Sequence, residues 1–276
     1  MDEKTVHFFT TSYNEDKNIR GEKQMSSRKN IFISHISEET EMAQLLKSEI
    51  EERFRGIFDV FVSSDGKSIQ GGDLWFTTIK NAIENADIML VLCSSKSIYR
   101  PWIPFEFGAG LMRGTKTIPI CHSDMSPNLL PMPFSAVQSW SISNNKELGN
   151  LFEMLSSLVE FNFREEEIFE VTDFLEKVTA IEKRYVFSGQ AISAIKELNE
   201  INPELAKLFD GSKIGRFNVT LYEFERDEAI PILKRLSEIG IVEFQDISMS
   251  AMMINSRGRF FQYDIVINPK IRDLYS

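Results

Sequence analysis

A tryptophan and a glutamate lie four residues apart in the segment PWIPFEFGAG, at Trp102 and Glu106. Residues at this spacing share one face of a helix, so the indole ring would lie next to the carboxyl group. A carboxylate in such a position can stabilise a positive charge that develops during a reaction, and an indole can stack on a flat ring. The ordinary alternative is a surface glutamate beside a core tryptophan. The strands and helices around this segment distinguish between a catalytic carboxylate and an ordinary surface glutamate.

Short apolar runs alternate with helical patterns on both sides of this segment. The predicted strands are NIFISH, IFDVFV, DIMLVLC and TIPIC, and a further apolar segment lies near AVQSW. Strand and helix alternate four times, which predicts an α/β domain with a parallel sheet flanked by helices. Ligands of such sheets bind beyond the carboxyl ends of the strands. That edge would carry His35 and the ranges 63–73, 94–106 and 122–133.

Charge and composition narrow the classes of function. The 276 residues carry a formal net charge of −10, which argues against a general nucleic-acid binder, because such proteins present a basic surface. The three histidines and two cysteines are mostly scattered, so no metal site is predicted. Cys93 and Cys121 lie in apolar strand-like runs and are predicted to be buried thiols. The chain has neither a membrane-spanning apolar run nor a signal-peptide core, so we expect a cytoplasmic protein.

The pattern changes after about residue 145, which predicts a second part of the chain. We expect an N-terminal tail over residues 1–29, the α/β domain over 30–160, a helical linker over 161–185 and an α+β module over 186–276. A helix over 226–239, followed by Gly-Ile-Val and two strand-like runs, resembles the end of a winged helix. DNA binding is not favoured, because from Phe187 onward eleven Lys and Arg stand against thirteen Asp and Glu. The preferred interpretation is a winged-helix-like sensing or oligomerisation module.

Three segments, taken in order, carry a resemblance to a known family. They are IFISH, the loop DGKSIQGGDLW and the stretch SSKSIYRPWIPFE. In order and spacing they resemble the first box, the mobile loop after the second strand and the tryptophan–glutamate helix of a bacterial Toll/interleukin-1 receptor (TIR) domain. The resemblance covers residues 30 to about 145 and implies a flavodoxin-like sheet. Arg100 stands where the family often has a serine, and Pro104 predicts that the helix begins only at that residue.

The resemblance implies an enzyme, because many bacterial TIR domains cleave NAD+ between nicotinamide and ribose with that glutamate. Nicotinamide leaves as a neutral molecule and needs no general acid, while positive charge builds on the ribose. A single carboxylate could therefore suffice, and the resemblance implies that Glu106 is catalytic, with NAD+ as substrate and no cofactor. Lys67 and Arg100 are candidates for neutralising the pyrophosphate. The other positions that match residues around the nucleotide are His35, Ile36, Asp65, Gly72, Trp75 and Trp102.

The family also implies partners. TIR domains contact one another through the loop at 65–75, and their activity often depends on such assembly. By resemblance, the setting is bacterial immunity against phage, with a phage-derived trigger or another defence protein as possible partners, and neither a membrane nor nucleic acid is expected. Two alternatives stay open beside the hydrolase. The site could make a cyclic ADP-ribose signal, or the domain could be a non-enzymatic adaptor, which the departures at Arg100 and Pro104 keep open.

Overall fold

The computed structural model describes residues 28–62, 72–159, 171–248 and 253–275, with only the backbone described at 72–75. Five parallel strands form the first sheet: β1 (Lys29–Ser34), β2 (Phe58–Val62), β3 (Ile88–Cys93), β4 (Lys116–Cys121) and β5 (Trp140–Ser141). Their order in the sheet is β2-β1-β3-β4-β5. This is the doubly wound order of flavodoxin-like folds, and the predicted α/β class is confirmed.

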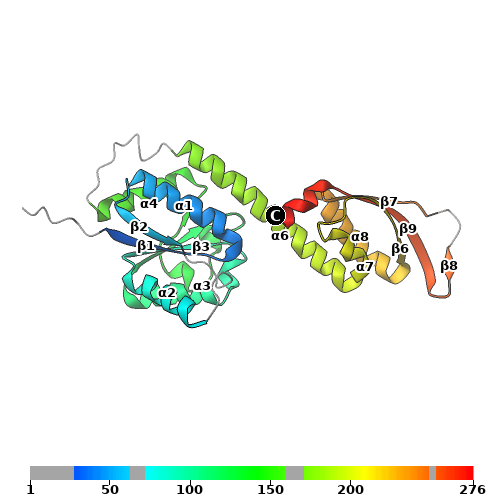
Figure 1. The fold of residues 1–276 in the computed structure, drawn as a ribbon, viewed down its shortest axis with the longest axis horizontal. Helices are drawn as coiled ribbons and strands as arrows, with labels where there is room; N and C mark the ends of the chain where they lie inside the picture. The colour runs from blue at the N-terminus through cyan, green and yellow to red at the C-terminus, as the bar shows by residue number, and fades with distance from the viewer. Residues whose placement is uncertain (1–27, 63–71, 160–170, 249–252, 276) are drawn as a thin grey trace, which may run out of the picture.

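Helices cover both faces of this sheet (Figure 1). One face packs against α1 (Thr40–Arg53) and α4 (Asn145–Leu158), and the other against α2 (Gly72–Asn85) and α3 (Trp102–Arg113). The central strand β3 is buried along its whole length. Ile88, Leu90 and Leu92 point into the first core, while the alternate residues of the strand point into the second. This two-sided burial explains why DIMLVLC is apolar throughout.

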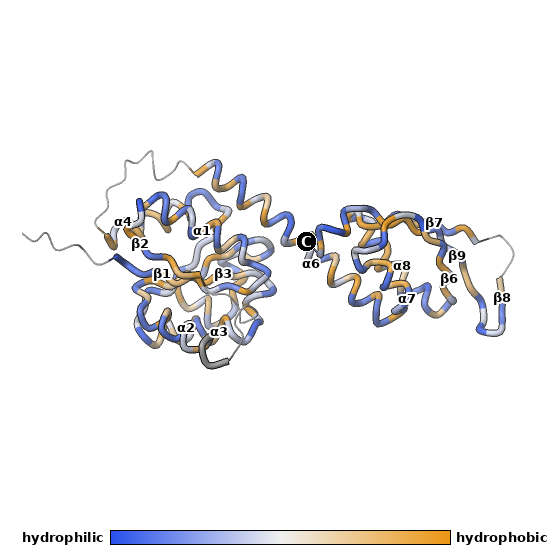
Figure 2. Tube along the Cα trace, in the orientation of Figure 1, coloured by the Kyte–Doolittle hydropathy of each residue, from blue (hydrophilic) through white to orange (hydrophobic). Residues whose placement is uncertain are grey.

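A single helix, α6 (Thr172–Ile201), joins the two parts of the chain (Figure 1). Phe174, Val178 and Ile181 belong to the core that α1 and α4 form with the sheet. Further along the same helix, Ala191 and Leu198 belong to the core of the C-terminal part. The predicted boundary between linker and module at residue 185 falls inside this helix, between the two sets. Figure 2 shows polar and apolar residues interleaved along it and apolar residues gathered on the central strands.

The C-terminal part is a small antiparallel sheet covered by helices. It contains α7 (Pro203–Ala206), β6 (Gly215–Tyr222), α8 (Glu223–Glu238), β7 (Val242–Asp246), β8 (Ile254–Asn255) and β9 (Gly258–Ile267). The strand order is β6-β9-β7, with β8 paired to β9. The expected helix and the two strand-like runs after it are present, and β6 is an additional strand. Gly240 has a φ of 77°, which explains the glycine between α8 and β7.

Within the part of the chain that the structure describes, no helix has the length and apolar character that crossing a membrane requires.

Candidate functional site

Helix α3 begins at Trp102, earlier than the predicted start at Pro104. Pro104 lies in the first turn, where a backbone N–H would lack an intrahelical acceptor, so a proline is tolerated there. Gly114, with a φ of 77°, ends the helix in the left-handed conformation that glycine adopts without strain. The helix therefore presents Trp102 and Glu106 on one face, as their spacing predicts.

The Glu106 carboxyl group is fully buried and held at both oxygens. The indole Nε1–H of Trp102 donates to Oε1 at 2.5 Å, and the Ser34 hydroxyl donates to Oε2 at 2.5 Å. Ser34 is the last residue of β1, so the carboxyl group lies at the carboxyl end of that strand. Burial raises the pKa of Glu106 to about 7, and the two hydrogen bonds oppose that rise because they favour the ionised form. Near neutral pH this carboxyl group is therefore present in both its protonated and its ionised form.

Trp102 is half-buried, and its ring lies among other aromatic rings. Its centroid is 5.0 Å from that of Phe105 and 6.3 Å from that of Phe76 on α2. These three side chains line part of an apolar groove of about 370 Å³ between α2 and α3. The indole thus connects the buried carboxyl group to an exposed apolar surface.

The structure places the other predicted site residues in different surroundings. His35 and Ile36 are buried directly after β1, and His35 Nε2 lies 3.2 Å from Thr40 Oγ1. Arg100 is exposed and forms an ion pair with Glu38 at 2.7 Å. Gly72 is the first residue of α2, and only the backbone of Trp75 is described. Asp65 and Lys67 lie outside the described residues. Ser34, His35, Ile36, Trp102 and Glu106 are thus gathered around the end of β1.

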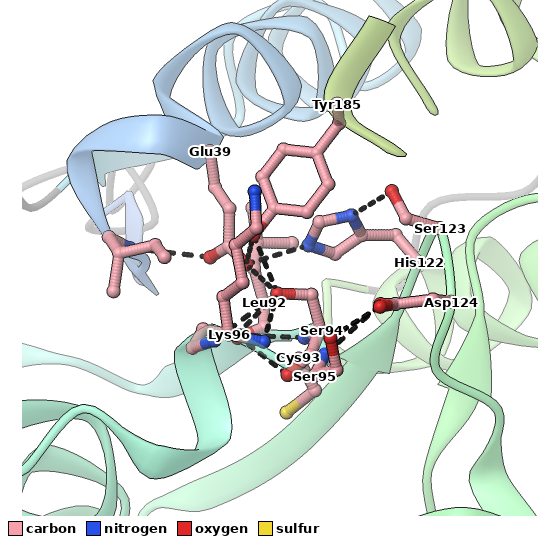
Figure 3. A network of polar contacts seen from close by, with 12 residues as sticks. Glu39, Leu92, Cys93, Ser94, Ser95, Lys96, His122, Ser123, Asp124 and Tyr185 are labelled. Atoms are coloured by element: carbon pink, nitrogen blue, oxygen red, sulfur yellow. Dashed lines mark hydrogen bonds and ion pairs between the residues drawn. The ribbon is translucent and has the colours of Figure 1, made fainter. Parts of the chain in front are cut away.

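A second polar cluster, centred on Glu39, lies at the same edge of the sheet (Figure 3). Oε1 of the fully buried Glu39 accepts from Ser94 at 2.7 Å, from Tyr185 at 3.3 Å, and lies 3.0 Å from His122 Nε2. The hydroxyl groups of Ser94 and Tyr185 are 2.8 Å apart. We call these four residues the Glu39 cluster. Sequence reasoning placed Ser94 and His122 on this edge but missed Glu39 and Tyr185, which no local pattern marks.

The Glu39 and Glu106 carboxyl groups are both buried, but their pKa values are shifted in opposite directions. Burial alone would raise the pKa of Glu39. The hydrogen bond and the charge of His122 lower this pKa, and so do the hydrogen bonds from Ser94 and Ser97. Together they exceed the effect of burial, so the pKa of Glu39 is lowered. Burial and the negative charge of Glu39 raise the pKa of the Tyr185 hydroxyl, which therefore stays protonated. Glu39 is thus an ionised carboxylate within a hydrogen-bonded cluster.

Next to this cluster, a cavity of about 530 Å³ lies between the sheet edge, α6 and the end of α8. Lys96 and Tyr185 form part of its wall, and the Lys96 ammonium lies 4.3 Å from the centre of the Tyr185 ring. Among the described residues, no group of three or more His, Cys, Asp or Glu side chains is placed to hold a metal ion. The two cysteines, Cys93 and Cys121, are buried and free, as predicted.

Comparison with known proteins supports a family for the first part of the chain. Residues 31–155 match the family model described as TIR domain. Among solved structures, the chain is similar to the TIR domains of the activated Roq1 resistosome, which directly recognises the pathogen effector XopQ. That match has 13% identity, covers 56% of this chain and 84% of the other, and has a TM-score of 0.26, so the family model and the strand order carry the assignment. No curated protein gives a significant match. Residues 31–155 of this chain are therefore a TIR domain.

Proposed function

We propose that the TIR domain cleaves NAD+ at the bond between nicotinamide and ribose, with Glu106 as the catalytic carboxylate. The observation that carries the proposal is the position of this carboxyl group, which is buried at the carboxyl end of β1 between Ser34 and Trp102. A carboxylate in a site shielded from water stabilises a nearby oxocarbenium ion more strongly than an exposed one does. Departure of the neutral nicotinamide needs no second acid, and a water molecule then adds to the ribose cation and loses a proton, which gives ADP-ribose.

The ionisation of Glu106 gives the proposal a pH dependence. Only the carboxylate stabilises a cation, and burial raises the pKa of this group to about 7. Nicotinamide release is therefore expected to rise as the pH increases through about 7. A glycosidase that needed Glu106 as a proton donor would lose activity over the same range.

The burial of Glu106 also supports activation by assembly. The carboxyl group has no exposed surface, and both oxygens accept hydrogen bonds from the protein, so substrate contact requires a rearrangement of its surroundings. Self-association of TIR domains is a means of driving such a rearrangement, because binding energy can stabilise a less populated conformation. We place this activity in the cytoplasm, in an anti-phage response that depletes NAD+.

The test is nicotinamide release from NAD+ by the wild type and by Glu106→Gln, over a hundredfold range of protein concentration. The wild type is expected to release nicotinamide at a rate that rises more than linearly with concentration, and the variant to release none. Glu84→Gln is the matched control, because Glu84 is half-exposed on α2 and forms an ion pair with Lys80 of the same helix. Equal release by the wild type and Glu106→Gln would refute the role of Glu106. Chromatography of the second product separates ADP-ribose from a cyclic product.

The same geometry favours one function of another class, a non-enzymatic adaptor. A fully buried glutamate with two donors is also what a purely structural residue would show, and Arg100 is already engaged by Glu38. An adaptor would assemble without turnover, and Glu106→Gln would leave its function in cells unchanged. Assembly measured by light scattering, in parallel with the nicotinamide assay, separates the two functions.

A further inference from the structure

Tyr185 connects α6 to the sheet edge of the TIR domain. Its hydroxyl lies 2.8 Å from that of Ser94 and donates to Glu39 Oε1 at 3.3 Å, and its ring supports the Lys96 ammonium at 4.3 Å. Four residues further along α6, a Cβ atom at Gly189 would lie 2.6 Å from Lys96 Nζ. The Lys96 side chain, from the loop after β3, therefore lies against α6 at Tyr185 (Figure 3) and at Gly189.

Glu39 transmits this contact to the turn that follows β1. Its Oε1 atom faces Tyr185, Ser94 and His122, whereas its Oε2 atom accepts from the Ile36 backbone N–H at 3.3 Å. The Glu39 N–H in turn donates to the Ile36 carbonyl oxygen at 2.8 Å. One buried carboxylate thus holds the turn over residues 36–39 on one side and the helix from the C-terminal part on the other.

This turn lies next to the group that binds Glu106. Ser34, two residues before Ile36, donates to Glu106 Oε2 at 2.5 Å. Ser94 begins the segment that continues through the short helix at 97–99 into α3, which carries Trp102 and Glu106. Both hydrogen-bond donors to Glu106 therefore belong to segments that the Glu39 cluster holds.

We propose that Tyr185 is a positioning residue for Glu106, acting through Glu39 and the turn after β1. The C-terminal part of the chain would then set the geometry of the TIR site through α6. The consequence for catalysis rests on the function proposed above, whereas the mechanical link from Tyr185 to the turn does not. The groups that influence the ionisation of Glu106 are Ser34 and Trp102. The groups that influence Glu39 are His122, Ser94 and Ser97.

The experiment compares the wild type with Tyr185→Phe, which removes only the hydroxyl group. Tyr275→Phe is the matched control, because the Tyr275 hydroxyl donates to the Phe209 carbonyl oxygen at 2.5 Å inside the C-terminal part. The first readout is hydrogen exchange of the Ile36 amide in full-length protein. Loss of the Tyr185 hydrogen bond is expected to speed this exchange by about 2-fold to 30-fold, which corresponds to the usual coupling energy between residues of a packed network. The control variant Tyr275→Phe is expected to leave the exchange rate unchanged.

The second readout is the pH dependence of nicotinamide release. A displaced Ser34 no longer favours the ionised form of Glu106, so in Tyr185→Phe the pH midpoint of activity is expected to move upward. A residue that only supports folding would lower the amount of active protein without moving this midpoint. Ser94→Ala, which removes a partner of both Tyr185 and Glu39, is the second variant and is expected to act in the same direction.

The two proposals fail separately. If the wild type releases no nicotinamide under any condition, the proposed function fails, and exchange at Ile36 alone decides the present inference. Wild-type exchange at Ile36 in folded Tyr185→Phe and Ser94→Ala would overturn it. Faster exchange in both variants with an unchanged midpoint in an active enzyme would also overturn it, because the turn would then move without affecting Glu106.

Discussion

Replacing Glu106 by glutamine is expected to stabilise the folded protein at pH 8, although it removes the residue proposed to carry the chemistry. The wild-type carboxyl group is fully buried, and its pKa rises from the ordinary value of 4.5 to about 7. At pH 8 the folded wild type therefore contains a buried carboxylate that the unfolded chain would expose to water. Glutamine has nearly the same shape and no charge to desolvate.

The size and the pH range of this effect follow from the pKa. Because the folded-state pKa lies above the unfolded value, Glu106 contributes stability below pH 4.5, and this contribution is lost as the pH rises through about 7. The full loss is about 3 kcal/mol, from about 1.4 kcal/mol for each pH unit between the two values. In the variant, the glutamine Oε1 can still accept from the Trp102 indole, and its Nε2–H can donate to the Ser34 hydroxyl oxygen, so the exchange of partners costs at most about 1 kcal/mol at every pH. The variant should thus gain about 2–3 kcal/mol on the wild type between pH 5 and pH 8.

Thermal unfolding of both proteins by calorimetry at pH 5, 6, 7 and 8 measures this gain. At about 2–4 °C per kcal/mol, the difference in Tm between variant and wild type should grow by roughly 5–10 °C over the series. The titration of all other groups is common to the two proteins and cancels in the difference. A difference in Tm that stays constant with pH, or that falls as the pH rises, would show that burial does not raise the pKa of Glu106.

Three further predictions concern the same domain. Glu39→Gln should destabilise the protein by roughly 3–5 kcal/mol at neutral pH, with a loss that shrinks as the pH falls below about 4.5, because the pKa of Glu39 is lowered in the folded state; Tm measured against pH checks this. Gly110→Ala should cost about 1–3 kcal/mol, since its Cβ would lie 2.6 Å and 2.7 Å from side chains of β3 and β4. Gly108→Ala meets nothing within 4 Å and should raise Tm by about 2–4 °C, because alanine favours a helix interior over glycine by about 1 kcal/mol. Cys93 and Cys121 should react with Ellman's reagent only as the protein unfolds, because burial raises the pKa of both thiols; a fast phase in native buffer would contradict their burial.

The features that could be predicted from the sequence are those with a local pattern. Each predicted strand of the parallel sheet is a separate apolar run, and the parallel arrangement follows from alternation with helices. The strand order does not follow from this alternation and was implied only by the resemblance to a TIR domain. The neighbouring positions of Trp102 and Glu106 follow from a spacing of four on one helix. Their hydrogen bond does not follow, because the spacing leaves open whether the indole faces the carboxyl group with its ring or with its N–H. The strand β6 was predictable, since Phe217, Val219 and Leu221 alternate with polar residues over GRFNVTLY.

The Glu39 cluster could not be predicted in this way. Its members come from positions 39, 94, 122 and 185, and each one alone is an ordinary polar residue. Only the parallel sheet, which brings the ends of β1, β3 and β4 to one edge, places three of them together. The fourth, Tyr185, depends on the path of α6. That path could not be predicted because the apolar residues of α6 pack into one core up to Ile181 and into another core from Phe187 onward.

The unbroken helix between Tyr185 and Ala191 makes the relative orientation of the two cores a matter of residue count. Each residue of an α-helix advances the chain by about 1.5 Å and turns it by about 100°. One residue added between these positions would swing the C-terminal sheet by about 100° around the helix axis, whereas seven added residues would bring it back to within about 20° of its starting direction, about 10 Å further away. With a flexible connection, neither insertion would fix a new orientation of the two parts. In this chain the number of helical residues between the two cores therefore determines the angle at which the C-terminal part is oriented relative to the TIR domain.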